Sequence, residues 1–264
     1  MKIARFSGPD GTVGFGVVDG VGPDGDVDGS ATITPILGHP YGALEIAGPA
    51  LPLADVRLLA PVLPSKIVAV GKNYAAHAQE MGGEVPLEPM IFLKPSTAVI
   101  GPGDPITLPE QSERVEHEAE LAVVIGRLCS EVPIRRVPEV VLGYTCANDV
   151  TARDLQATDG QWGRAKGFDT FCPLGPWIET DLDPAAVSVR CTVNGEVRQD
   201  GTTADMVRGA AELVAWISNV MTLLPGDVIL TGTPAGVGPI VDGDTVSVQI
   251  SSLGTLTNRV VTRA

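Results

Sequence analysis

Turn-forming residues recur throughout this chain and limit the folds that are open to it. The 264 residues include 31 glycines and 22 prolines, while only 4% are aromatic. Because glycine and proline interrupt helices and mark turns, this density favours many short strands joined by turns over a helical bundle. One long amphipathic helix is still predicted, since apolar residues recur at helical spacing at Met206, Ala210, Leu213, Ile217 and Val220.

Charge and cysteine content narrow the environment of the protein. Lys and Arg number 18 against 32 Asp and Glu, which gives a net charge of -14 at pH 7. Nucleic acids and anionic membranes attract basic surfaces, so this balance argues against both as main partners. The sequence has no apolar run of the roughly 20 residues that cross a bilayer, and its cysteines are far apart. We therefore expect a globular, cytoplasmic protein.

Two domains are predicted, a small one over residues 1–60 and a larger one over residues 61–264. KIARFS and TVGFGVV, joined by a Pro-Asp-Gly turn, predict a hairpin in the first domain, and the rest of that domain is expected to be irregular. The second domain carries strand-like runs, and its Asn194-Gly195 pair predicts a further hairpin. These runs are KIVAVG, RVEHEAELAVVIG, VVLGYTCANDV, DVILTG, DTVSVQI and TLTNRVVT.

Two short helices are expected beside these strands. Asn73 opens the first, YAAHAQEM, which Gly82 and Gly83 stop. The second is expected to begin at Thr151, because TARD has the spacing of a capping box. A strand that leads into a short helix is a common way to present side chains at a site.

Carboxylates alternate along RVEHEAEL and form the strongest candidate for a metal site. Glu116, Glu118 and Glu120 are two residues apart and so lie on one face of a strand. A solvated acidic face is the simpler interpretation, but the strand continues into the apolar AVVIG and therefore runs inward. Asp149, at the end of another strand, would complete an all-oxygen set with Glu118 and Glu120, which suits Mg²⁺ or Mn²⁺.

Other polar residues are candidates for the chemistry of such a site. His77 and Glu80 are three apart on the first helix and could form a carboxylate-oriented general base, although a surface ion pair is an equal alternative. Lys94, Lys166 and Arg153 could hold an anionic substrate, or be ordinary solvated cations. The loop LTGTPAGVG could bind a carboxylate through its backbone and Thr233. It lacks the Gly-Lys-Ser/Thr ending of a phosphate-binding loop, which disfavours nucleotide binding.

Seven segments together resemble the fumarylacetoacetate hydrolase family. They occur in the family's order over about residues 64–239: KIVAVGKNYAAHAQE, MIFLKPSTAVIGPGD, EHEAELAVVIG, GYTCANDVTARDLQ, RAKGFDTFCPLGPWI, VNGEVRQ and LLPGDVILTGTPAGVGP. The match departs in one place, since Glu116-His117 stands where many members carry Asp-Tyr. The first 60 residues resemble the leading domain of shorter members only loosely.

This resemblance implies a mostly β fold with some α structure, a mixed β-roll or sandwich, preceded by a small β-rich domain. It implies an Mg²⁺ or Mn²⁺ ion on Glu118, Glu120 and Asp149, a catalytic pair His77 and Glu80 on a short mobile helix, and a homodimer. Lys166 would lie near the metal-bound substrate. The residues expected to bind the substrate are Arg153, Gln156, Lys94, Tyr74 and Thr233.

The expected function is a reaction of a small 2-oxo or 2-hydroxydienoate dicarboxylic acid. Such a substrate would chelate the metal, which would stabilise an enolate. Chain length and motifs are similar to those of the family's 2-hydroxyhepta-2,4-diene-1,7-dioate isomerases and their decarboxylase relatives, so the resemblance implies a reaction of this type in aromatic-compound catabolism. A C–C bond hydrolase of the acylpyruvate or fumarylacetoacetate type and an oxaloacetate decarboxylase remain open, as does a non-catalytic binding module stabilised by a cation.

Overall fold

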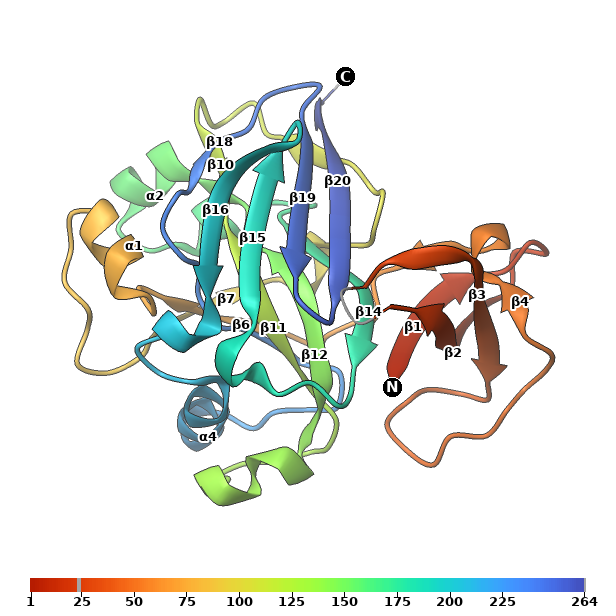
Figure 1. The fold of residues 1–264 in the computed structure, drawn as a ribbon. Helices are drawn as coiled ribbons and strands as arrows, with labels where there is room; N and C mark the ends of the chain where they lie inside the picture. Colours follow the sequence, from red (N-terminus) through yellow and green to blue (C-terminus); the bar gives the residue numbers. More distant parts are fainter. Residues whose placement is uncertain (23–24, 264) are drawn as a thin grey trace.

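The computed structural model describes residues 1–22 and 25–263, whose strands form three sheets (Figure 1). The largest sheet has twelve strands. Ten of them lie in the order β4 (Leu51–Pro52), β3 (Val27–Ile36), β2 (Val13–Val21), β1 (Lys2–Ser7), β14 (Cys172–Glu179), β12 (Val141–Asn148), β11 (Ala119–Ile125), β17 (Val228–Leu230), β6 (Ile67–Gly71) and β7 (Met90–Lys94). The other two are β5 (Arg57–Leu59), which pairs with β1, and β8 (Val99–Ile100), which pairs with β14.

Two smaller sheets complete the β structure. One has five strands in the order β16 (Glu196–Thr202), β15 (Ser188–Val193), β19 (Thr245–Ile250), β20 (Gly254–Thr262) and β9 (Ile106–Leu108). The other has three, β13 (Thr151–Ala152), β10 (Val115–His117) and β18 (Gly238–Pro239). The expected mostly β fold with some α structure is confirmed.

Helices are few and short, as the glycine and proline content predicts. The α-helices are α1 (Ala75–Glu80), α2 (Arg153–Asp159), α3 (Gly163–Lys166) and α4 (Ala210–Val220). The 3-10 helices are η1 (Leu53–Asp55), η2 (Ser96–Ala98), η3 (Ile134–Glu139), η4 (Pro184–Ala186) and η5 (Thr203–Asp205). None of the helices in the described residues is long and apolar enough to span a membrane.

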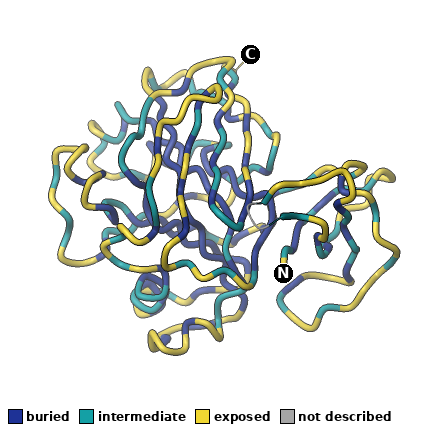
Figure 2. Tube along the Cα trace, in the orientation of Figure 1, coloured by how far each residue is buried: buried dark blue, intermediate teal, exposed yellow. Residues whose placement is uncertain are grey.

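The main core lies between the five-stranded sheet and the β11–β12 part of the large sheet. Leu121 of β11 and Cys146 of β12 belong to the same fully buried cluster as Val189, Val248 and Leu256 from the facing sheet. Figure 2 shows the buried residues concentrated between these layers, with exposed residues along the loops. Burial of this apolar surface is the main force that holds the two layers together.

The N-terminal region extends the large sheet. Strand β1 pairs with β14 through Lys2 opposite Glu179, and Figure 1 shows β1–β4 beside the larger body. The Met1 ammonium and Lys2 Nζ lie 2.5 and 2.9 Å from the Glu179 carboxylate. Burial alone would raise the pKa of Glu179, but hydrogen bonds from these two cations and from the Asp181 backbone lower it to about 2. The junction is therefore electrostatic as well as backbone-paired.

Several local predictions need correction. The stretch after the first hairpin is not irregular, because it contains the ten-residue strand β3. The long helix begins at Ala210 and not at Met206, which instead forms an isolated bridge with Tyr74. Thr151 lies in strand β13 and caps no helix, since its hydroxyl donates to the Asp149 carbonyl at 2.8 Å.

The hairpin prediction at Asn194-Gly195 is confirmed. Strands β15 and β16 pair across this dipeptide, and both residues have positive φ, 54° and 82°. Positive φ at both central positions is typical of the tight turn that Asn-Gly prefers. Helix α1 is also found where it was predicted, although Asn73 bonds the Thr231 and Arg208 carbonyls and Tyr74 occupies the N-cap.

Candidate active site

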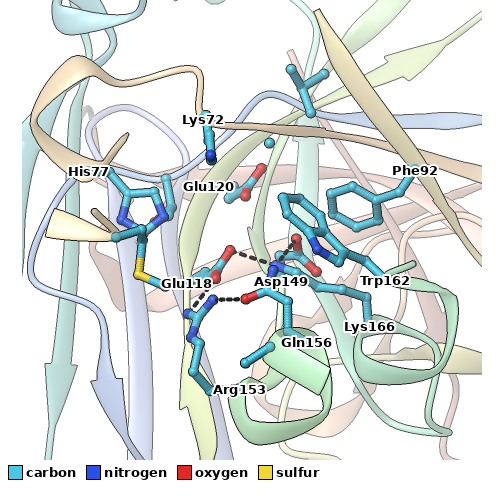
Figure 3. A pocket seen from close by; sticks show the side chains of 15 residues that line it. Lys72, His77, Phe92, Glu118, Glu120, Asp149, Arg153, Gln156, Trp162 and Lys166 are labelled. Atoms are coloured by element: carbon cyan, nitrogen blue, oxygen red, sulfur yellow. Dashed lines mark hydrogen bonds and ion pairs between the residues drawn. The ribbon is translucent and has the colours of Figure 1, made fainter. Parts of the chain in front are cut away.

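A cavity of about 320 Å³ lies beside β6, β11 and the three short helices α1–α3. Figure 3 shows its acidic floor and the basic and aromatic side chains around it. The residues that line it are Val70, Gly71, Lys72, His77, Met81, Phe92, Glu118, Glu120, Asp149, Arg153, Gln156, Ala157, Trp162, Lys166 and Thr233. Eight of the eleven predicted site residues are among them, and the other three are Tyr74, Glu80 and Lys94.

The three predicted metal ligands meet at the floor of this cavity. One oxygen from each of Glu118, Glu120 and Asp149 lies within 4.8 Å of the others, and all three residues are buried. The pairing of β11 with β12 places Ala119 opposite Asn148, so Glu118 and Asp149 leave the two strands side by side. The Asp149 amide donates to the Glu118 carbonyl at 2.8 Å. The interpretation as a solvated acidic face is therefore wrong.

The strand that carries these carboxylates is interrupted at Glu118. Strands β10 and β11 stop on either side of it and belong to different sheets. Gln199 of β16 holds both sides, because its Oε1 accepts from His117 Nδ1 at 3.0 Å and from the Ala119 amide at 2.9 Å. Its Nε2 donates to Thr233 Oγ1 at 2.7 Å. Gln199 therefore fixes the backbone around Glu118.

Buried cations surround the acidic cluster. Lys166 Nζ lies 2.7 Å from both Glu118 Oε2 and Asp149 Oδ2. Lys94 Nζ lies 2.5 Å from Asp149 Oδ1, and Arg153 Nη2 lies 2.6 Å from Glu118 Oε1. Both lysine side chains are 2% exposed or less, so the interpretation of these lysines as solvated cations is wrong.

The surrounding charges shift the pKa values of Glu118 and Glu120 in opposite directions. Burial alone would raise the pKa of Glu118, but the Lys166 and Arg153 charges bring it below its usual value. Burial raises the pKa of Glu120 well above its usual value, and the Asp149 and Glu118 charges raise it further. The Gly232 amide donates to Glu120 Oε2 at 2.6 Å. A divalent cation fits this set, because its donors are converging carboxylate oxygens. The three basic side chains pair with Glu118 and Asp149, whereas Glu120 has no described ion pair, so they offset the repulsion within the cluster only in part.

His77 and Glu80 form the predicted pair at the edge of the cavity. His77 Nδ1 donates to Glu80 Oε2 at 3.0 Å, and Glu80 Oε1 accepts from the Gly236 amide at 3.0 Å. The His77 side chain is 8% exposed, whereas that of Glu80 is 32% exposed. Because His77 lines the cavity, the pair is more than the surface ion pair that its spacing also allowed.

The predicted substrate residues separate into two groups. Arg153, Gln156 and Thr233 line the cavity, and Arg153 Nη1 donates to Gln156 Oε1 at 2.5 Å. Lys94 and Tyr74 are buried outside the lining, and Lys94 pairs with the lining residue Asp149. Thr233 already donates to the Ala119 carbonyl at 2.8 Å.

Lys72 and Trp162 were missed by the sequence reasoning. Both line the cavity (Figure 3). Lys72 directly follows strand β6 and precedes α1. The sequence signal for it is this position, between a strand and the helix that carries His77 and Glu80. Trp162 precedes α3 in a segment without a periodic pattern, so no comparable signal was available.

The chain matches two family models. The description "Fumarylacetoacetate (FAA) hydrolase C-terminal" applies to residues 66–261, and "Rv2993c-like, N-terminal" to residues 1–61. Protein Rv2993c of Mycobacterium tuberculosis is 56% identical over 99% of this chain and 98% of the relative. Human oxaloacetate tautomerase FAHD2A, a mitochondrial protein, is 46% identical over 83% of this chain and 74% of the relative.

Two solved structures are similar to this chain in both sequence and fold. A 5-carboxymethyl-2-hydroxymuconate delta-isomerase from Mycobacterium smegmatis is 57% identical, with a TM-score of 0.91 and full coverage of both chains. Fumarylpyruvate hydrolase from Pseudomonas aeruginosa, solved with Mn²⁺ and pyruvate, is 34% identical, with a TM-score of 0.72 over 78% of this chain and 92% of the other.

Proposed function

This chain belongs to the fumarylacetoacetate hydrolase family, and from that premise we propose that it is a divalent-metal-dependent enzyme of small 2-oxo or 2-hydroxydienoate dicarboxylic acids. The proposed reaction is of the 2-hydroxyhepta-2,4-diene-1,7-dioate isomerase or decarboxylase type. The M. smegmatis isomerase supports this choice, because it is more than half identical over its whole length.

The observation that carries the proposal is the buried cluster of Glu118, Glu120 and Asp149 on the floor of a cavity. Buried carboxylates this close repel one another, and because Glu120 has no described ion pair, a bound cation would stabilise the cluster. These three residues would hold Mg²⁺ or Mn²⁺. When bound, such an ion supplies Lewis-acid polarisation of the carboxylate and 2-oxo oxygens of a substrate.

The remaining residues would bind the substrate and move its proton. Because His77 Nδ1 faces Glu80, Nε2 is the ring nitrogen left to accept a proton from the substrate carbon next to the 2-oxo group. Glu80 keeps the ring in that tautomer and stabilises the imidazolium that forms. The Arg153 and Lys166 cations lie beside the acidic cluster, where they offset negative charge that develops on the substrate.

The test combines metal binding with turnover. We expect one Mn²⁺ per chain by calorimetry, and Mn²⁺-dependent isomerisation of a 2-hydroxydienedioate followed by its ultraviolet absorbance. Glu118→Gln should abolish both, whereas Glu110→Gln, which removes an exposed carboxylate that has no described ion pair, should change neither. Metal binding and thermal stabilisation without turnover of any 2-oxo dicarboxylate would instead support a non-catalytic binding module.

C–C bond hydrolysis is the second candidate, favoured by the His77–Glu80 pair and by the likeness to fumarylpyruvate hydrolase. Here His77 Nε2 would take a proton from water, and the resulting hydroxide would attack the distal carbonyl. The C–C bond between that carbon and the pyruvate part would then break, the electron pair would leave with pyruvate as its enolate, and the His77 imidazolium would return the proton to the enolate carbon. An acylpyruvate assay distinguishes the two reactions, because hydrolysis releases pyruvate and a second acid in equal amounts. With oxaloacetate, the release of CO₂ distinguishes decarboxylation from tautomerisation.

A further inference from the structure

Lys72 differs from the other cations of the cavity in its backbone. Its φ is 57°, in the left-handed region that residues other than glycine rarely adopt. Such strain persists where surrounding structure enforces it, and it concentrates at ligand sites. Here the two flanking elements, β6 and α1, leave two residues between Gly71 and Tyr74 for the change of direction. This backbone conformation directs the Lys72 side chain into the cavity (Figure 3).

Lys72 also differs in its charge environment. Arg153 is paired with Glu116 and Glu118, and Lys166 with Glu118 and Asp149. Within the described part of the chain, no salt bridge is formed by Lys72. Its ammonium lies against the backbone of Gly83, where a Cβ would be only 2.5 Å from Nζ. Because Lys72 lines the cavity and forms no described salt bridge, its charge is available to an anion bound there.

The position of this charge indicates which end of a substrate it meets. In Figure 3, Lys72 and Arg153 lie on opposite sides of the cavity, with Glu118 and Glu120 between them. Under the proposed function, the 2-oxo acid end of a substrate binds at the acidic cluster beside Arg153 and Lys166. A second carboxylate on the same molecule would then lie near Lys72, on the side of the cavity opposite Arg153.

We propose that Lys72 binds the distal carboxylate of the substrate and makes the cavity select 2-oxo dicarboxylates over 2-oxo monocarboxylates. This inference rests on the proposed function and assigns a specificity residue to it. A lysine ammonium is suited to the role because it is a compact charge on a flexible stem and adapts to substrates of different length. The chain has a net charge of -14 and would repel a dianionic substrate. The half-buried Lys72, which has no described salt bridge, reduces this repulsion inside the cavity.

The experiment measures binding and not turnover. Dissociation constants of the Mn²⁺-loaded protein are determined by calorimetry for 2-oxo dicarboxylates of four to seven carbons and for monocarboxylates of the same lengths. A charge-assisted contact predicts a preference of about 10- to 100-fold for the best-fitting dicarboxylate. Lys72→Met should abolish that preference and leave monocarboxylate affinity unchanged, while Lys72→Arg should retain it. Methionine and arginine carry the same backbone strain as lysine, so the comparison isolates the charge.

Arg135→Met is the matched control, because it removes one exposed cation that has no described ion pair and changes the net charge equally. It should leave every affinity unchanged. Equal losses for both ligand classes in Lys72→Met, or no preference in the wild type, would overturn the role of Lys72 while the proposed function stands. Failure of every 2-oxo acid to bind the metal-loaded wild type would overturn both.

Discussion

Lys166 provides the sharpest test of how the acidic cluster is balanced. Its ammonium contacts Glu118 and Asp149 at 2.7 Å, and all three side chains are 5% exposed or less. Replacing it with methionine keeps most of the side-chain volume but leaves two buried carboxylates without their shared partner. Removing one partner of a buried ion pair costs about 3–5 kcal/mol. In a chain of this size that corresponds to a fall in Tm of roughly 10 °C.

Metal binding should respond in the opposite direction. Lys166 and a divalent cation neutralise the same carboxylates, so loss of the lysine removes a competitor. We expect the Lys166→Met variant to bind Mn²⁺ at least about tenfold more tightly, a gain of about 1.4 kcal/mol. Its kcat/KM should nevertheless fall sharply at saturating metal, because negative charge that develops on the substrate loses a partner.

The assay is calorimetric titration with Mn²⁺ together with thermal unfolding with and without the metal. Lys66→Met is the control, since Lys66 pairs with Asp227 and does not line the cavity. It should lower Tm without changing Mn²⁺ affinity. The reasoning is refuted if Lys166→Met binds Mn²⁺ no more tightly than the wild type, or if it retains the wild-type rate.

Three further outcomes are expected. His77→Ala and Glu80→Ala should each lower kcat, and the double variant should lose little more than His77→Ala alone, because the pair acts as one unit; independent losses that multiply would contradict this. Glu179→Gln should lose about 2 kcal/mol at pH 7. Since the folded pKa of Glu179 is about 2, its contribution is present above its ordinary pKa and disappears as the pH falls through 2, so acid unfolding curves of wild type and variant should converge. Gln199→Leu should weaken Mn²⁺ binding although it touches no ligand side chain, and unchanged affinity would remove its positioning role.

Much of the fold follows from local sequence patterns. The apolar runs after residue 66 became the central strands β6, β11, β12 and β17, because their length and burial leave little alternative. Strand β3 was missed because its pattern is half exposed and interrupted by Gly29. The start of α4 was misplaced because Met206 has the right spacing and is held by a bridge to Tyr74 instead. Tertiary contacts, which periodicity does not report, decided both cases.

In the candidate site too, local spacing predicts some residues, whereas the contacts of others depend on tertiary packing. The alternation of Glu118 and Glu120 and the strand-end position of Asp149 are visible in the sequence, and the structure brings their oxygens together. Their counter-charges are less visible, because Lys94 and Lys166 are 55 and 17 residues from Asp149. Spacing identifies residues that share an element, whereas ion pairs between elements depend on how those elements pack.

The break at Glu118 shows why a strand pattern alone could not describe this site. An uninterrupted strand would run through one sheet, yet β10 and β11 lie in different sheets and Glu118 joins them. Buried backbone amides at such a break need acceptors from side chains: the Glu118 amide donates to Asn148 Oδ1 at 2.9 Å, and the Ala119 amide donates to Gln199 Oε1 at 2.9 Å. The side-chain amide of Gln199 also donates to Thr233 Oγ1. Thr233 follows Gly232, whose backbone amide donates to Glu120. One side chain of the facing sheet therefore links the two segments that position both glutamates, and the geometry of the metal ligands depends on how the two layers pack.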